Sequence, residues 1–239
     1  AQGPPAAAGV AKAVRAYRVA HEQPIIQELV DLLAIPNIAS DEPNIRRNAD
    51  RLKAMLERRG FGVRFFEIPK RGPIIFAELA APGAARTVVF YAHYDGQPTD
   101  PKAWTGTGPF EPGLRTDSIE AGGALRPFPG AGTPYQDDWR IYARSASDDK
   151  SPIVALLAAI DALAAKGIAR AVNLRVVLDS EEENGSPALG PALAAHRDLV
   201  RGDLLVTGDG PVHPSGRPLL FYGNRGVFDL NLTVYGPVP

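Results

Sequence analysis

The chain has 239 residues, of which 45% are hydrophobic and 22% are charged, and its formal net charge is −1. This length suffices for one large domain, or one domain and part of another, with a sizeable buried core. A near-neutral chain without a long basic block argues against nucleic acid or an anionic membrane as partner, and the lack of cysteine excludes disulfides and cysteine-based zinc sites.

The chain begins with the small-residue segment AQGPPAAAGVAKAV, of the kind that signal peptidase leaves on exported proteins. A periplasmic or secreted location and a cytoplasmic one both stay open. The first expected element is a helix over 25–33 with Pro24 in its first turn, followed by an amphipathic helix over 44–59 that Gly60 ends. Further expected elements are strands at 62–68, 74–79 and 87–91, a helix at 150–166, a strand at 172–178, a helix at 187–200, and strands at 203–207, 219–222 and 227–234.

This alternation of helices and strands predicts an α/β fold with a mixed, largely parallel sheet and helices on both faces. Residues 101–138 fit no periodicity and are rich in glycine and proline. A loop of this length inside a compact domain is usually functional or disordered.

Four clusters of polar, metal-competent residues follow apolar strands or lie on the loops beyond them. Ligands of open α/β sheets bind beyond the carboxyl ends of the strands, so the four clusters are expected to converge. They are His93 with Asp95, Asp148 with Asp149, the acids from Asp179 to Glu183, and Asp209.

Each cluster alone also has an ordinary structural explanation. These explanations are a hydrogen-bonded His–Asp pair, a helix N-cap at Ser147 or Asp148, a solvated turn at EEEN and a tight turn at GDG. As a set, the four structural explanations are less convincing than each one alone, because they must account for the same placement after a strand four times. Two divalent cations that share a bridging carboxylate, with a further carboxylate as proton acceptor, would use the whole set.

The motifs HYDGQP, ARSASDDKSP, SEEENGS and GDG, in this order, resemble those of the di-zinc metallopeptidases that include carnosinases, cytosolic dipeptidases, aminoacylases and succinyl-diaminopimelate desuccinylase. HYDGQP is most similar to the dipeptidase branch. The resemblance implies hydrolysis of a peptide or amide bond, in dipeptide-like or N-acyl amino acid substrates, by water that zinc activates. It implies two Zn²⁺ per complete site, whereas the expectation of no nucleic-acid or membrane partner comes from the charge.

The resemblance also implies a role for each matching metal ligand. His93 and Asp209 would bind one zinc, Asp148 would bridge the two, and Glu183 would bind the second.

Two further roles come from the same resemblance. Glu182 would be the general base, and Asp95 would orient His93 from the side of the ring that faces away from the metal. The Asp148–Asp149 peptide bond is expected to be cis.

The sequence departs from the family pattern in several places. Ser151 stands where the family has glycine, and the segment 110–148 is longer than usual. The family inserts a smaller lid domain, which often dimerises, after a strand like the one expected at 227–234. We therefore expect a catalytic domain over 1–224, the first strand of a mostly absent lid over 225–239, and a homodimer through the lid.

The family's final histidine ligand has no convincing counterpart. His213 lies on a proline-flanked loop, and His21 and His196 lie in helical patterns where solvation is expected. The 239-residue chain alone is therefore expected to have an incomplete site, which holds one zinc well and a second one weakly and gives little or no peptidase activity.

Two alternatives to a dipeptidase remain. The first is the related bacterial aminopeptidase class, which tends to have asparagine where this chain has Lys150. The second is a non-catalytic binding module that uses the 101–138 loop; the Glu182–Glu183 pair argues against it, whereas the missing histidine favours it.

Overall fold

The computed structural model describes residues 7–210, 219–220, 223, 226 and 230–236. The chain forms two units, Ala1–Asp209 and Gly210–Pro239, and the described residues of the second unit form no helix or strand. The strands expected at 219–222 and 227–234 lie partly outside the described residues, as does the predicted domain boundary at 224. His213 lies outside them entirely.

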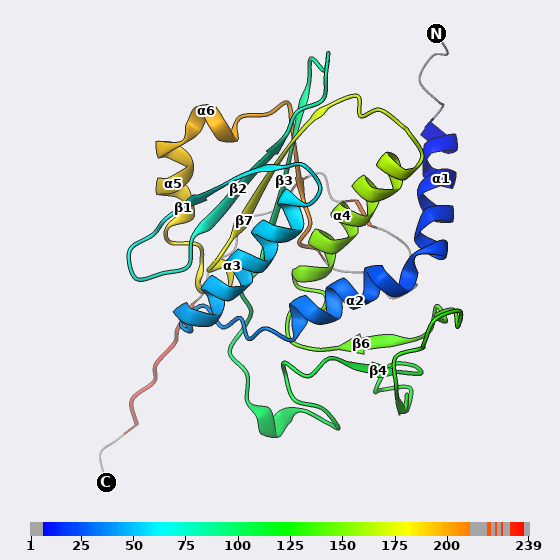
Figure 1. Cartoon of the computed structure of the whole chain (residues 1–239). Coiled ribbons are helices and arrows are strands. Elements are labelled where there is room, and N and C mark those ends of the chain that lie inside the picture. Colours follow the sequence, from blue (N-terminus) through cyan, green and yellow to red (C-terminus); the bar gives the residue numbers. More distant parts are fainter. Residues whose placement is uncertain (1–6, 211–218, 221–222, 224–225, 227–229, 237–239) are drawn as a thin grey trace. The chain divides into compact units, whose positions relative to one another are not determined.

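Within residues 7–210, five strands form the main sheet in the order β1-β2-β7-β3-β8 (Figure 1). β2 runs antiparallel to β1 and β7, whereas β3 runs parallel to β7 and β8. Four of the five strands therefore point the same way, which confirms the predicted mixed, largely parallel sheet. The strands are β1 (Gly62–Phe66), β2 (Ile74–Leu79), β3 (Thr87–His93), β7 (Asn173–Asp179) and β8 (Leu204–Thr207).

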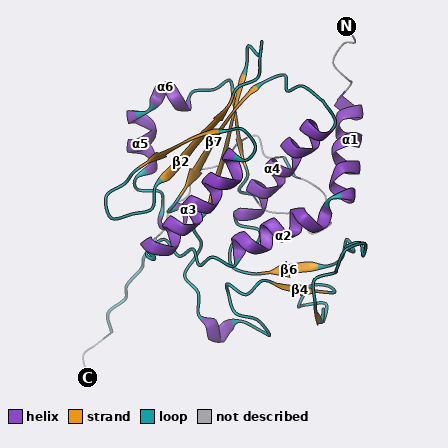
Figure 2. Ribbon diagram, in the orientation of Figure 1, coloured by secondary structure: helices purple, strands orange, loops and turns teal. Residues whose placement is uncertain are grey.

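Helices cover both faces of this sheet, as predicted (Figure 2). The apolar sides of α2, α3 and α4 pack on one face, and α5 and α6 pack on the other. No helix in the described part of the chain is both long and apolar enough to cross a membrane. The helices are α1 (Ala7–Ala20), α2 (Glu22–Leu33), α3 (Glu42–Glu57), α4 (Lys150–Ala165), α5 (Leu189–Ala195) and α6 (Arg197–Val200).

Two helical segments differ from the expectation. α1 was not predicted, although its apolar residues Val10, Val14 and Tyr17 recur at helical spacing and are partly buried; none of its residues is fully buried. The helix expected at 187–200 is divided at His196, whose ring stacks on Phe66 with 3.9 Å between the centroids. His196 is thus partly buried rather than solvated, whereas His21 is exposed and stacks on Tyr17.

The aperiodic segment 101–138 contains regular structure that is too short to produce a period. A 3₁₀ turn, η1 (Pro101–Ala103), precedes a small sheet with the order β5-β4-β6. The buried Arg115 donates hydrogen bonds to the carbonyls of Gly123 (2.8 Å) and Thr105 (2.7 Å), which holds the segment together. The strands are β4 (Gly113–Arg115), β5 (Leu125–Arg126) and β6 (Arg140–Tyr142).

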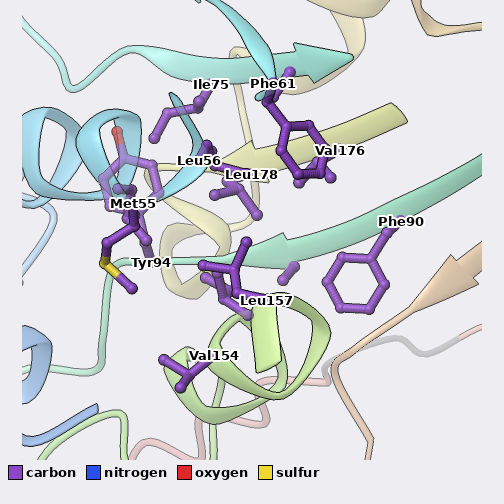
Figure 3. Close-up of a cluster of buried hydrophobic side chains, with 14 of the residues drawn as sticks. Met55, Leu56, Phe61, Ile75, Phe90, Tyr94, Val154, Leu157, Val176 and Leu178 are labelled. Carbon is purple, nitrogen blue, oxygen red and sulfur yellow. The ribbon is translucent and has the colours of Figure 1, made fainter. Parts of the chain in front are cut away.

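The main core ends directly at the candidate site. Tyr94 follows the last residue of β3 and is fully buried among core side chains that include Met55 and Leu157 (Figure 3). Its hydroxyl donates a hydrogen bond to the carbonyl of Pro73. Successive side chains of an extended segment point in opposite directions, so a Tyr94 anchored in the core turns His93 and Asp95 away from it.

Candidate metal centre

The parallel strands place the predicted site residues at one edge of the sheet. His93 is the last residue of β3, and Asp209 lies two residues beyond β8, which pairs with β3 in parallel. Asp148 lies two residues before the start of α4. This edge is where the carboxyl ends of β3, β7 and β8 meet, as the pattern predicted.

Three potential ligands converge there. One atom each of His93, Asp148 and Asp209 lie within 4.8 Å of one another, and His93 Nε2 is 2.8 Å from Asp148 Oδ1. Imidazole nitrogen and carboxylate oxygens are ligands that suit zinc and similar divalent ions, so these residues fit a metal. Glu183 is not among the residues that converge here, and its carboxylate accepts a hydrogen bond from Gln97 Nε2 at 2.5 Å.

Asp95 lies behind the imidazole and connects it to the turn that carries the two glutamates. The Nδ1 atom of His93 is 3.3 Å from Asp95 Oδ1 and 3.2 Å from the Asp95 carbonyl oxygen. The carboxylate of Asp95 also accepts hydrogen bonds from the backbone N–H groups of Glu182 (3.0 Å) and Glu183 (3.2 Å). Asp95 is fully buried, so these contacts hold His93 with Nε2 free to face the other ligands.

The acids around His93 change its charge state. Burial lowers the pKa of the imidazole, but the hydrogen bond to Asp95 and the charges of Asp95, Asp149 and Asp148 outweigh it and raise the pKa to about 10. A bound cation would replace the proton as the positive charge among these acids.

Glu182 is partly buried beside this group, with Oε2 3.9 Å from His93 Nε2. Burial raises the pKa of its carboxyl group, and the charges of Asp209, Glu183 and Asp95 raise it further, against an opposing contribution from His93. A carboxylate with a raised pKa accepts a proton more readily, which suits a general base.

The N-cap residue of α4 is Asp149, not Ser147 or Asp148 as the explanation by a helix cap expected. The side chain of Asp149 makes no capping hydrogen bond and instead accepts a hydrogen bond from the backbone N–H of His93 at 3.3 Å. The Asp148–Asp149 peptide bond is cis, as predicted.

The acidic run after β7 divides into structural and site-facing residues, a division that the sequence did not predict. The buried Asp179 accepts hydrogen bonds from the Ser180 N–H (2.7 Å) and the Ser186 hydroxyl (2.6 Å). The buried Glu181 pairs with Arg71. Both therefore stabilise the turn that carries Glu182 and Glu183.

Lys150 has a structural role that its sequence motif did not indicate. Its side chain is fully buried, and Nζ donates hydrogen bonds to the carbonyls of Leu32 (2.9 Å) and Ile35 (3.2 Å). Burial lowers the pKa of its amine to about 7. The lysine satisfies carbonyl groups at the end of α2 and so fixes the start of α4, next to Asp148.

The chain is similar to known metallopeptidases over most of its length. Residues 89–217, more than half of the chain, match the peptidase family M20/M25/M40. The Cys-Gly metallodipeptidase dug1 of Schizosaccharomyces pombe is 27% identical over 227 residues, which cover 89% of this chain and 43% of the relative. The Beta-Ala-His dipeptidase of Mus musculus is 26% identical over 223 residues, covering 86% of this chain and 41% of the relative.

A solved structure shares both fold and sequence. The M20 family metallo-carboxypeptidase Sso-CP2 from Sulfolobus solfataricus has a TM-score of 0.64 and 29% identity, over 81% of this chain and 39% of that chain. The chain thus spans less than half of the length of the curated relatives it matches.

Proposed function

Because this chain belongs to the peptidase family M20/M25/M40, we propose that it catalyses the metal-dependent hydrolysis of a peptide bond in a dipeptide-like substrate. The observation that carries the proposal is the convergence of His93, Asp148 and Asp209 at the carboxyl edge of the sheet, with Glu182 beside them. Two of the relatives are named as dipeptidases, which supports a small peptide as the substrate class. The same reaction would also hydrolyse the broader class of N-acyl amino acids.

In this proposal His93, Asp148 and Asp209 bind the first ion, which we propose to be zinc. Asp148 has further carboxylate capacity to bridge to a second ion, for which Glu183 is the proposed ligand. A divalent metal bound here would supply Lewis-acid chemistry, polarising the scissile carbonyl and lowering the pKa of a water molecule.

Glu182 would accept a proton from the attacking water and deliver it to the amine that leaves when the C–N bond breaks. Its raised pKa favours the first of these transfers. Asp95 would keep the imidazole of His93 oriented throughout, because it contacts Nδ1 and both glutamate N–H groups.

The dipeptidase relatives support this function over the two alternatives, an aminopeptidase of the related class and a non-catalytic binding module. A lid that begins near residue 225 and a homodimer formed through it stay predictions.

The test separates metal binding from turnover. In a complete enzyme, Glu182→Gln should reduce dipeptide hydrolysis by roughly 10²–10⁴-fold, the usual contribution of a general base, while zinc affinity changes little. His93→Ala should lose both. Dipeptide turnover by Glu182→Gln near the wild-type rate would contradict the assignment of the base, and undiminished zinc binding by His93→Ala would contradict the metal centre.

A further inference from the structure

Asn37, in the connection between α2 and α3, contacts both segments that carry the first metal ligands. Its side chain is fully buried, and Nδ2 donates hydrogen bonds of 2.8 Å to the carbonyl of Tyr94 and to the hydroxyl of Ser145. Its own carbonyl accepts a hydrogen bond from the N–H of Gly96 at 2.9 Å. One residue thus contacts the chain on each side of Asp95, and also the segment that leads to α4.

Ser145 lies on the segment that leads to α4 and contacts both Asn37 and Asp95. It is buried and has a φ of 62°, in the left-handed region that glycine adopts more readily than serine. Its hydroxyl accepts the hydrogen bond from Asn37 and donates one to the Asp95 carbonyl at 3.3 Å. Glycine would suit the backbone better, so these two hydrogen bonds give a physical reason for a serine here.

Gly96 permits the close approach of the two segments. A Cβ atom at this position would lie 2.5 Å from Ser145 Oγ and 3.0 Å from Arg144 Cδ. Any larger residue would push the Ser145 segment away from the end of β3.

We propose that Asn37, Gly96 and Ser145 form a positioning clamp that fixes His93 relative to Asp148. The hydrogen bonds of the clamp go to Tyr94, Asp95 and Ser145 rather than to the side chains of His93 or Asp148. The clamp holds the backbone on both sides of Asp95, which contacts His93, and it holds Ser145, three residues before Asp148. The inference rests on the proposed metal centre, and it adds residues from a third segment to that centre.

We expect loss of the clamp to affect metal affinity as the loss of other contacts that orient metal ligands does. Loss of such a contact typically weakens metal binding by about 10–100-fold. The visible absorption of Co²⁺ at the site serves as the probe, because it reports on ligand geometry as well as occupancy.

Asn37→Asp is the informative variant, because it keeps the size of the side chain and removes both donated hydrogen bonds. Asn173→Asp is the control. Asn173 begins β7 at the end of the sheet opposite the site, and its Nδ2 donates hydrogen bonds to the Ala84 carbonyl (3.4 Å) and the Thr87 hydroxyl (3.5 Å).

Co²⁺ titration of the whole protein should show roughly 10–100-fold weaker binding and an altered spectrum for Asn37→Asp. Asn173→Asp should lower the melting temperature and leave both Co²⁺ readouts unchanged. As a second test, Gly96→Ala should weaken Co²⁺ binding, because the added Cβ would lie 2.5 Å from Ser145 Oγ; wild-type Co²⁺ binding in Gly96→Ala would contradict the clamp.

His93→Ala separates the two levels of the proposal. Lost Co²⁺ binding in His93→Ala together with wild-type binding in Asn37→Asp would overturn the clamp alone. Equal losses in Asn37→Asp and Asn173→Asp would also overturn it, because the effect would then be one of stability. Wild-type Co²⁺ binding in His93→Ala would overturn the metal centre, and the clamp with it.

Discussion

Replacing Asp95 with asparagine tests whether the orientation of His93 controls metal affinity. The substitution keeps the shape of the side chain but replaces one carboxylate oxygen with an NH₂ group. In the wild type, the two oxygens accept from Glu182 N–H (3.0 Å) and Glu183 N–H (3.2 Å), and Oδ1 also lies 3.3 Å from His93 Nδ1. Asparagine therefore leaves at least one buried N–H facing another donor.

The expected losses of unfolding free energy and of zinc affinity follow from these contacts. A hydrogen bond to a charged group contributes about 1.5–3 kcal/mol, and an unsatisfied buried donor costs about 1–3 kcal/mol. We expect the free energy of unfolding to fall by about 2–4 kcal/mol, because the neighbouring turn relaxes in part. For metal binding, the loss of an orienting carboxylate predicts about 10–100-fold weaker zinc affinity.

Zinc affinity would be measured by competition with a chromophoric chelator, and stability by urea unfolding without metal. Asp203→Asn is the control, because the Asp203 carboxylate accepts a hydrogen bond from the Thr87 N–H (2.7 Å) at the opposite end of the same strand. It should leave zinc affinity unchanged. An Asp95→Asn protein with wild-type zinc affinity would refute the view that Asp95 orients the ligand.

Three further predictions concern stability and metal choice. Burial raises the pKa of Glu28, but hydrogen bonds and charge from Arg59 lower it overall. Its ionised form therefore stabilises the fold above pH 4.5, its ordinary pKa, and this contribution is lost below that pH; Glu28→Gln should flatten the acid side of the melting temperature against pH. Leu157→Ala, at a fully buried position, should lower the unfolding free energy by about 2–5 kcal/mol in urea, whereas Leu125→Ala, at an exposed one, should change it by less than about 0.5 kcal/mol. Calorimetric titration should give affinities that rise from Mn²⁺ through Co²⁺ to Zn²⁺, because a nitrogen and carboxylate ligand set follows that order; tightest binding of Mn²⁺ would contradict this ligand set.

The sequence predicted those parts of the molecule in which a local pattern decides the structure. β2 has the predicted bounds, and the ends of β3, β7 and β8 carry the polar residues that mark the site edge. The convergence of His93, Asp148 and Asp209 could be expected because parallel strands present their carboxyl ends at one edge.

Other parts of the structure depend on tertiary contacts that no local sequence pattern indicates. Five residues from Asp179 to Glu183 include four acids, and only tertiary partners such as Arg71 and Ser186 separate the structural acids from the site-facing ones. Lys150 could not be recognised as buried, because a lysine at a helix start is usually solvated. Asn37 lies more than fifty residues before Tyr94 and shares no motif with it.

The ligands of the proposed first metal differ in how firmly the fold holds them. His93 is fully buried and is held through Nδ1 and through its backbone N–H, whereas the Asp148 side chain is 61% exposed and Asp209 is exposed. The nitrogen ligand is thus placed by folding, and the carboxylates are the ligands free to adjust to an ion. Preorganisation lowers the cost of binding only for groups that are already fixed. The contacts that decide affinity should therefore be the ones behind His93, made by Asp95 and the clamp, rather than any that restrain the two exposed aspartates.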